Sequence, residues 1–129
     1  MKVSIITVCF NSAKTIEHTI QSVINQNCSN IEYIIIDGAS SDNSLLIIEK
    51  YKDNIDLIIS EKDNGIYDAL NKGIEKSSGD IIGFLHADDF FKNNNIIQNI
   101  LDSFINNNID MLYGNIQYVD QSNSEKVIR

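Results

Sequence analysis

Short runs of apolar residues alternate along the chain with longer segments in which apolar residues recur every three or four positions. The short runs are almost entirely apolar and rich in Ile and Val, as strands buried on both faces usually are. They predict four strands, over residues 3–10, 33–36, 57–59 and 81–85. A fifth strand is predicted over residues 110–119.

The segments between the strands have the spacing of amphipathic helices. They predict helices over residues 13–27, 43–52, 65–77 and 95–107. Ser41 or Asp42 can cap the second helix, because a side-chain oxygen there accepts a free N–H group of the first turn. The residues expected on the inner faces are Ile16, Ile20, Val23 and Ile24, then Leu46, Ile47 and Ile48, and finally Ile96, Ile97, Ile100, Leu101, Phe104 and Ile105.

The order of these elements, strand and helix in alternation, predicts an α/β fold. Such a chain forms a Rossmann-like, mostly parallel sheet with helices on both faces. Ligands of these sheets bind beyond the carboxyl ends of the strands, near the point where the strand order reverses. The rule points to the loops at residues 10–11, 37–38 and 86–89, and the segment 61–71 can join them.

The chain has 129 residues and a formal net charge of −8, and we expect one domain over residues 1–129. A protein that binds nucleic acid usually presents a basic surface to displace counterions, so the charge argues against a nucleic-acid partner. An acidic protein that binds a small diphosphate needs a local remedy, such as a metal cation or the amides of a helix N-terminus.

The cysteines and the N-terminus bear on the compartment. Cys9 and Cys28 are far apart and form no CxxC pair, which favours two free thiols in a reducing environment. The first residues, MKVSIITVCFN, contain one Lys and a short apolar run without a small-residue cleavage site. This run is too short to span a bilayer, and it indicates a mature strand rather than a signal peptide. We therefore expect a cytoplasmic protein.

Asp88 and Asp89 are the strongest candidates for chemistry, because they follow directly on the buried run of the fourth strand. Carboxylate oxygens suit Mg²⁺ or Mn²⁺, which take one or two protein carboxylates together with phosphate oxygens and water. A cation there would screen a diphosphate from the negative charge of the protein. Alternatively, one of the two residues only begins the next turn or helix. His86 is open between a third metal ligand, a phosphate contact and a polar strand end.

Other polar positions give further candidates, each with a plainer alternative. Residues 10–15, FNSAKT, hold no glycine-rich phosphate loop, which argues against a dinucleotide-binding dehydrogenase and a P-loop enzyme. Asp37 can accept hydrogen bonds from a ribose or base, or it can form an Asp-Gly turn. Asn64 and Asn71 can recognise a base or sugar, or they can be a turn residue and a surface residue. Gly73 costs a helix about 1 kcal/mol relative to Ala, so it requires a packing reason or a nearby ligand.

Four segments together resemble family 2 of the inverting glycosyltransferases. They are VSIITVCFN at 3–11, IIIDGASSDNS at 34–44, EKDNGIYDALNKGI at 61–74 and GDIIGFLHADD at 79–89. They occur in the order of the family and cover nearly the whole chain, and DNGIYDALNKG is the most specific of them. The resemblance implies a GT-A fold, in which a Rossmann-like half binds a nucleotide-sugar.

The resemblance also implies roles for single residues. The implied donor-binding residues are Thr7, Phe10, Asn11 and Asp37 at the base and ribose, Asn64 and Asn71 on the uridine side, and Ala87 at the ribose and diphosphate. His86 stands where the DxD motif of the family has its first acidic residue. The pattern is therefore HADD, which leaves Asp88 and Asp89 as the implied ligands of Mg²⁺ or Mn²⁺.

The implied reaction is the transfer of a sugar from a UDP-linked donor to a glycan or lipid-linked acceptor in bacterial surface polysaccharide synthesis. An acceptor hydroxyl, deprotonated by a general base, attacks the anomeric carbon while the diphosphate leaves with inversion. In the family, the acceptor-binding region and the base lie further along, so we expect a chain truncated before them. Peripheral contact with the inner face of the membrane would come through that region. Asp89 is only a weak stand-in for the base.

Three other functions compete with this one. A non-catalytic nucleotide-binding module would bind the donor without transferring the sugar. A receiver-like signalling domain requires acidic residues after the first strand and a lone Asp after the third, where this chain has Phe10-Asn11 and Ser60-Glu61. A nucleotidyltransferase requires a glycine- and arginine-rich signature near the first strand, and residues 3–15 do not contain one.

Overall fold

The computed structural model describes residues 1–112, 118–120 and 123–128, the last two ranges through their backbone alone. Four parallel strands form a sheet in the order β3-β2-β1-β4, and their bounds are β1 Val3–Cys9, β2 Ile31–Asp37, β3 Leu57–Ser60 and β4 Ile81–Phe84. The chain thus steps from β1 outward to β3 and then returns to the other side of β1. The reversal of strand order falls between β1 and β4, where such sheets bind ligands.

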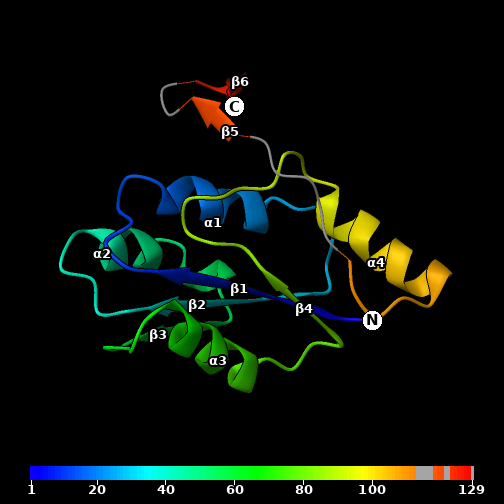
Figure 1. Ribbon diagram of the computed structural model, residues 1–129, viewed down its shortest axis with the longest axis horizontal. Coiled ribbons are helices and arrows are strands. Elements are labelled where there is room, and N and C mark those ends of the chain that lie inside the picture. The colour runs from blue at the N-terminus through cyan, green and yellow to red at the C-terminus, as the bar shows by residue number, and fades with distance from the viewer. Residues whose placement is uncertain (113–117, 121–122, 129) are drawn as a thin grey trace.

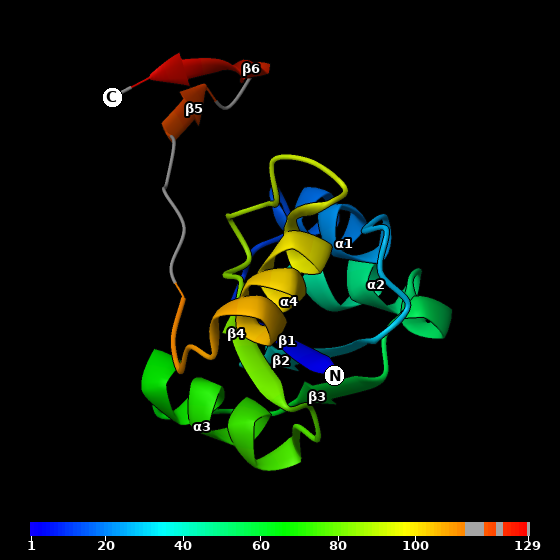
Figure 2. The same ribbon diagram turned by 90° about the vertical axis from the view of Figure 1, so that its right-hand side faces the viewer.

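Helices cover both faces of the sheet, as the sequence predicts. They are α1 Ile16–Ile24, α2 Ser44–Glu49, α3 Ile66–Lys76 and α4 Ile96–Asn107, with a short 3₁₀ helix, η1, over Lys52–Asn54. Figures 1 and 2 show α1, α2 and α4 on one side of the sheet and α3 alone on the other. The predicted α/β fold with a mostly parallel sheet is therefore confirmed.

The core has two parts, one on each face of the sheet. The larger lies under α1, α2 and α4, and its fully buried members include Ile16, Ile20 and Ile97. The smaller lies under α3 and contains Ile6, Val8, Ile34, Ile36 and Ala69. The side chains of each strand alternate between the two parts, which explains why the strand sequences are apolar at nearly every position.

Gly73 of α3 has the packing reason that its place in a helix requires. A Cβ atom at this position would lie 2.5 Å from Cγ2 of Ile6 on β1. The glycine therefore lets the helix backbone lie directly on the central strand, and a ligand is not needed to explain it.

Three details of the predicted helices are wrong. Leu46 of α2 is 69% exposed and Ile105 of α4 is 60% exposed, so both point to solvent although their spacing placed them inside. The N-cap position of α2 is Asn43 rather than Ser41 or Asp42. The Asp42 carboxylate nevertheless accepts a hydrogen bond from the N–H of Ser44, the first residue of the helix.

The predicted fifth strand agrees with the structure only at its end. Residues 110–112 are irregular, and 113–117 lie outside the described residues. Strand β5, Tyr118–Asp120, pairs antiparallel with β6, Asn123–Ile128, and the two form a separate sheet. The parallel sheet thus has four strands in the described part of the chain.

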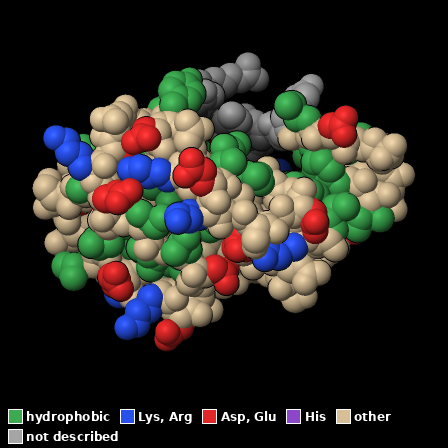
Figure 3. Space-filling view, turned by 90° about the horizontal axis from the view of Figure 1, so that it is seen from below, with side chains coloured by type: hydrophobic (Ala, Val, Ile, Leu, Met, Phe, Trp, Pro, Cys, Tyr) green, Lys and Arg blue, Asp and Glu red, His purple; other side chains and the backbone are tan. Residues whose placement is uncertain are grey.

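Hydrophobic side chains are exposed at several places on the side of the molecule that carries α3 (Figure 3). Helix α3 packs over β1 and β2. Ile82 and Phe84 of the edge strand β4 therefore stay exposed, and Ile66, Tyr67 and Ile74 of α3 are exposed as well. Among the described residues, the longest helices fall short of the length and apolarity that crossing a bilayer demands.

Glu32, on β2, predicts a specific acid sensitivity of the fold. Burial acts to raise the pKa of this carboxyl, but hydrogen bonds from Ser4 and Ser78, with the charge of Lys2, lower it from 4.5 to about 2. A lowered pKa in the folded state contributes stability that is complete above pH 4.5 and is lost as the pH falls toward 2. We expect Glu32→Gln to reduce the loss of unfolding free energy between these pH values, as measured by urea unfolding. Glu75→Gln, at an exposed position of α3, is the control, and an equal change in both variants would contradict the prediction.

Candidate functional site

An open cleft of about 1110 Å³ lies at the carboxyl end of the parallel sheet. Its floor is the end of β1, and its walls come from the loops that follow all four strands. The lining residues are Val8, Cys9, Phe10, Asn11, Ser12, Ala13, Lys14, Thr15, Asp42, Asp63, Gly65, Ile66, Ala69, His86, Ala87 and Asp88. The cleft thus lies where the strand order predicts a ligand.

Hydrogen bonds to the side chain of Asn11 join the loop after β1 to the loop after β2. The side-chain oxygen of Asn11 accepts hydrogen bonds from the N–H groups of Ser41, at 2.8 Å, and Asp42, at 3.3 Å. The backbone of Asn11 has a φ of 49°, a left-handed conformation that Asn tolerates better than most residues. The Asp42 carboxylate in turn accepts a hydrogen bond from the N–H of Ala13. The two loops therefore form one continuous wall of the cleft.

Asp37 lies beneath this wall and is fully buried. Its carboxylate accepts hydrogen bonds from the N–H and hydroxyl of Ser40, the hydroxyl of Ser60 and the thiol of Cys9. Burial acts to raise the pKa of Asp37, but these hydrogen bonds outweigh it and the pKa is lowered. Burial and the charge of Asp37 together raise the pKa of the Cys9 thiol far above its ordinary value. In this structure, Asp37 therefore supports the wall from inside and does not line the cleft.

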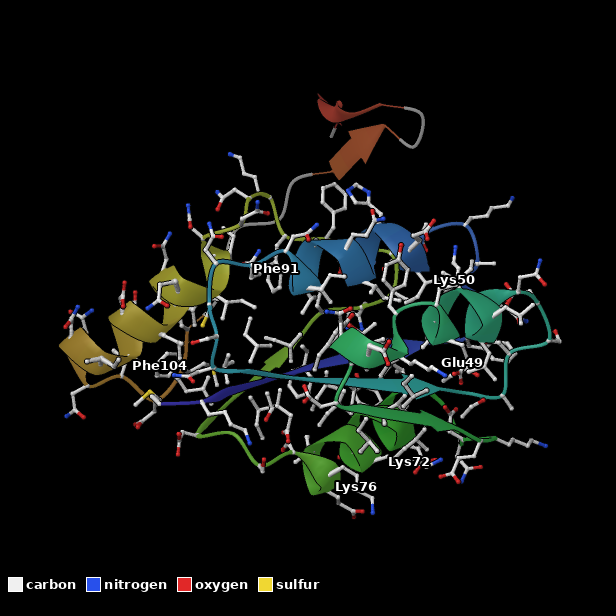
Figure 4. The ribbon with its side chains drawn as sticks, turned by 180° about the vertical axis from the view of Figure 1, so that it is seen from behind. Glu49, Lys50, Lys72, Lys76, Phe91 and Phe104 are labelled. Carbon is white, nitrogen blue, oxygen red and sulfur yellow. The ribbon has the colours of Figure 1, made fainter. Side chains whose placement is uncertain are left out.

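The segment after β3 brings a second carboxylate to the cleft, after that of Asp42. Asp63 accepts a hydrogen bond from the N–H of Gly65, and its carboxylate packs against Gly38, where a Cβ atom would lie 2.8 Å from Oδ2. Asp68 holds the same segment by accepting the N–H of Asn64 at 3.0 Å. Lys72, labelled on α3 in Figure 4, donates to the carbonyl of Lys62 and forms ion pairs with Glu61 and Asp68.

The opposite wall is a tight turn over residues 86–89. The N–H of Asp89 donates to the carbonyl of His86 at 3.0 Å, Ala87 is buried, and Asp88 is exposed to the cleft. Asp89 is also exposed but does not line the cleft. Partial burial and the adjacent charge of Asp88 raise the pKa of Asp89, whereas the charge of His86 acts to lower it. A cation beside Asp88 would relieve the repulsion within this acidic pair.

The metal-ligating side chains at the cleft fit one kind of metal site and exclude another. Within residues 1–112, no three His, Cys, Asp or Glu side chains gather closely enough to hold a metal ion by themselves. An all-protein metal cage is therefore not present in this part of the chain. One or two carboxylates next to an open cleft are what Mg²⁺ or Mn²⁺ requires when phosphate oxygens and water complete the coordination. Asp88 and Asp89 fit this second arrangement.

The structure brings only part of the predicted residues to the cleft. Four of them line it, namely Phe10, Asn11, Ala87 and Asp88. Asp89 follows the lining residues directly, and the other four lie behind the walls or outside them. These four are Thr7, buried and hydrogen-bonded to Tyr33, the buried Asp37, and Asn64 and Asn71, both exposed on the α3 side.

The cleft also contains residues that the sequence analysis did not select. Asp63 precedes Asn64-Gly65 within the most specific segment, so the order of that segment could have pointed to it. Asp42 was expected only as a cap, whereas it both binds the start of α2 and lines the cleft. Lys14 has no signal of its own in the sequence. It is nevertheless the one Lys or Arg among the lining residues, which also include three aspartates.

Known proteins resemble the chain both in sequence and in structure. An Escherichia coli protein, UDP-Glc:alpha-D-GlcNAc-diphosphoundecaprenol beta-1,3-glucosyltransferase WfgD, is 33% identical over 121 residues, or 93% of this chain and 47% of that protein. The chain spans about half the length, or less, of the curated relatives it matches.

Two solved structures show the fold. S. aureus TarS 1-349 in complex with UDP-GlcNAc superposes with a TM-score of 0.75 and 24% identity, over 81% of this chain and 31% of that chain. Mannosyltransferase PcManGT from Pyrobaculum calidifontis, in complex with GDP-Man and Mn²⁺, has a TM-score of 0.75 and 20% identity, over 82% of this chain and 33% of that chain. These likenesses establish the GT-A type of fold.

The sequence model described as glycosyl transferase family 2 matches residues 4–129, nearly the whole chain. This match is consistent with the GT-A fold and with the presence of a cleft at the carboxyl end of the sheet. The chain belongs to glycosyl transferase family 2.

Proposed function

We propose that this chain binds the donor in the transfer of a sugar from a UDP-linked nucleotide-sugar to a glycan or lipid-linked acceptor. The transfer is an inverting single displacement and serves the synthesis of a bacterial surface polysaccharide. The observation that carries the proposal is the position of Asp88, an exposed carboxylate in a cleft where the strand order reverses. A cleft walled by carboxylates in a protein of net charge −8 can accept a diphosphate only if that charge is neutralised locally.

The walls of the cleft have separate roles in this proposal. Asp88, with Asp89 beside it, would hold a divalent cation, which when bound would screen the diphosphate and stabilise it as a leaving group. Asn11 and Asp63, on the side of β2 and β3, would orient the nucleoside through polar contacts, with Asp37 supporting that wall from within. The Phe10 ring, 63% exposed at the cleft, offers an apolar face to a base or sugar.

Names and titles of similar proteins support the donor, the metal and the acceptor. The name of the E. coli relative states a UDP-glucose donor and a diphosphoundecaprenol-linked acceptor. The two solved structures contain UDP-GlcNAc in one case and GDP-Man with Mn²⁺ in the other. We favour UDP for this chain because its most specific segment, DNGIYDALNKG, resembles the uridine side of the family's donor site.

Calorimetric titration of the chain with UDP, with Mn²⁺ and with a chelator in its place, tests the proposal. We expect Mn²⁺ to strengthen UDP binding by about 100-fold or more, which corresponds to about 2.8 kcal/mol. GDP should bind more weakly than UDP under the same conditions. Equal UDP affinity with Mn²⁺ and with chelator would remove the metal from the proposal. Tighter binding of GDP would overturn the assignment of the donor.

A further inference from the structure

A row of polar residues on α1 and in the turn after it holds the segment 85–95, which connects β4 to α4 and contains the acidic turn. Thr19 and Ser22 are three residues apart on one face of α1, and Gln26 lies in the turn that follows the end of the helix at Ile24. Thr19 and Gln26 are buried, and all three form hydrogen bonds to the backbone of that segment or of α4. A helix face turned toward a core normally carries apolar residues, so this row requires an explanation.

The segment 85–95 contains no helix or strand, so most of its backbone groups need partners outside regular structure, although the N–H of Leu85 donates to the carbonyl of Ile6 on β1. The side chains of this row provide some of these partners. The Ser22 hydroxyl accepts a hydrogen bond from the N–H of Phe91. The Gln26 amide donates to the carbonyl of Asn93 and accepts from the N–H of Ile97, in the first turn of α4. Figure 4 shows Phe91 beside α1.

Thr19 acts at the acidic turn itself. Its Oγ1 lies 2.9 Å from the carbonyl oxygen of Ala87 and 2.5 Å from that of Asp89. These carbonyls belong to the residues on either side of Asp88. A hydroxyl carries one proton, so Thr19 donates it to one of the two carbonyls at a time. Nearby, the ring of His18 stacks on that of Phe90, with the ring centroids 4.0 Å apart.

We propose that Thr19 is a positioning residue for the metal-binding turn. By holding the two carbonyls that flank Asp88, its buried hydroxyl fixes the direction in which the Asp88 carboxylate enters the cleft. Ser22 and Gln26 anchor the rest of the segment to α1 and to the turn after it. This inference rests on the proposed function, because it assigns to Thr19 an effect on metal-assisted nucleotide binding without contact to metal or nucleotide.

Thr19→Val, which removes the hydroxyl and keeps the shape, gives the test. Without metal or nucleotide, the Asp89 amide should exchange its hydrogen with solvent about fivefold faster, because one hydrogen bond contributes about 1 kcal/mol. The gain in UDP affinity that Mn²⁺ produces should fall by about tenfold in this variant. The affinity for UDP in the presence of chelator should change by less than about twofold. A general loss of stability would lower both affinities together.

Two further variants and one control make the outcome decisive. Thr19→Ser keeps the hydroxyl and should restore both the slow exchange and the Mn²⁺ effect. Thr19→Cys, a weaker donor of similar size, replaces Thr19→Val if that protein does not fold. Ser4→Ala is the matched control, because Ser4 is also buried and its hydroxyl is hydrogen-bonded to Glu32, but it lies at the start of β1. Ser4→Ala should lower stability and leave the Mn²⁺ effect unchanged.

The outcomes separate this inference from the proposed function. If Mn²⁺ does not raise the UDP affinity of the unsubstituted chain, the metal is removed from the proposed function. Thr19 then also loses its assigned role in metal binding. Amide exchange in the Thr19 variants then still decides whether Thr19 holds the turn. If the unsubstituted chain shows the effect, and Thr19→Val keeps both that effect and the slow exchange of the Asp89 amide, the inference is overturned.

Discussion

Asp88→Ala should remove about 100-fold or more of the gain in UDP affinity that Mn²⁺ produces, whereas Asp89→Ala should remove less than about tenfold. Loss of even an outer-shell partner of a metal ligand costs about 10–100-fold in metal affinity, and Asp88 is the carboxylate that lines the cleft. Asp89 is exposed but lies outside the lining, so its contribution is mainly to the local charge. The measurement is calorimetric titration with UDP at several Mn²⁺ concentrations.

Asp102→Ala provides the control for this comparison. Asp102 is an exposed carboxylate on α4 that accepts a hydrogen bond from Gln98, so its removal changes the net charge equally and leaves the cleft intact. In the Asp102→Ala variant, the gain in UDP affinity that Mn²⁺ produces should stay within about twofold of the gain in the unsubstituted chain. If Asp88→Ala behaves like Asp102→Ala, or if Asp89→Ala is the more damaging variant, the assignment of Asp88 as the principal ligand is wrong.

Gly73→Ala should lower the free energy of unfolding by about 1–2 kcal/mol, although alanine is the better helix former by about 1 kcal/mol. The added Cβ would lie 2.5 Å from Cγ2 of Ile6, which is fully buried on the central strand β1. That atom belongs to a β-branched side chain with one strongly preferred rotamer, so it cannot move aside without displacing the strand. Overpacking of this kind costs about 1–3 kcal/mol.

The sign of the effect should reverse when Ile6 is shortened. Ile6→Ala alone should cost about 2–5 kcal/mol through the cavity it leaves. In that background, Gly73→Ala should be neutral or stabilising, because the clash is gone and the helix propensity remains. Glu75→Ala, an exposed position of the same helix, should change stability by less than about 0.5 kcal/mol. Urea unfolding of the unsubstituted chain, the Gly73→Ala and Ile6→Ala variants and the double variant gives the coupling energy between the two positions. Additive effects on the free energy of unfolding would contradict this account of Gly73.

The sequence predicts the parallel sheet well for a physical reason. Strands buried on both faces must be apolar at nearly every position, and such runs are hard to mistake for a surface segment. Helix faces are less certain, because periodicity does not show how wide the covered stripe is. Leu46 and Ile105 match the spacing but lie beyond the edge of the contact with the sheet. The extent of each covered face depends on tertiary packing.

The candidate site is predictable where a residue's neighbours in sequence decide its place. Asp88 comes shortly after the apolar run of β4, so its position at the edge of the sheet follows from the pattern. Thr19 is a polar residue on α1 and Gln26 lies just after the end of that helix, and their sequence context does not reveal that they are buried against a segment about seventy residues away. Asp37 carries the right chemistry at the right strand end, but a ligand contact and an internal support have the same sequence signature.

Ala39 has a φ of 61°, in the left-handed region that costs an L-residue other than glycine about 1–2 kcal/mol. The next residue, Ser40, is tied to Asp37 by both its amide and its hydroxyl. Loss of the Asp37 carboxylate would free this strained corner to relax, and the wall built on Asn11 and Ser41 would relax with it. An inactive Asp37 variant would therefore report the collapse of a scaffold as readily as the loss of a nucleotide contact. To distinguish the collapse of the wall from the loss of a nucleotide contact, the structure of the variant must be measured without nucleotide and metal.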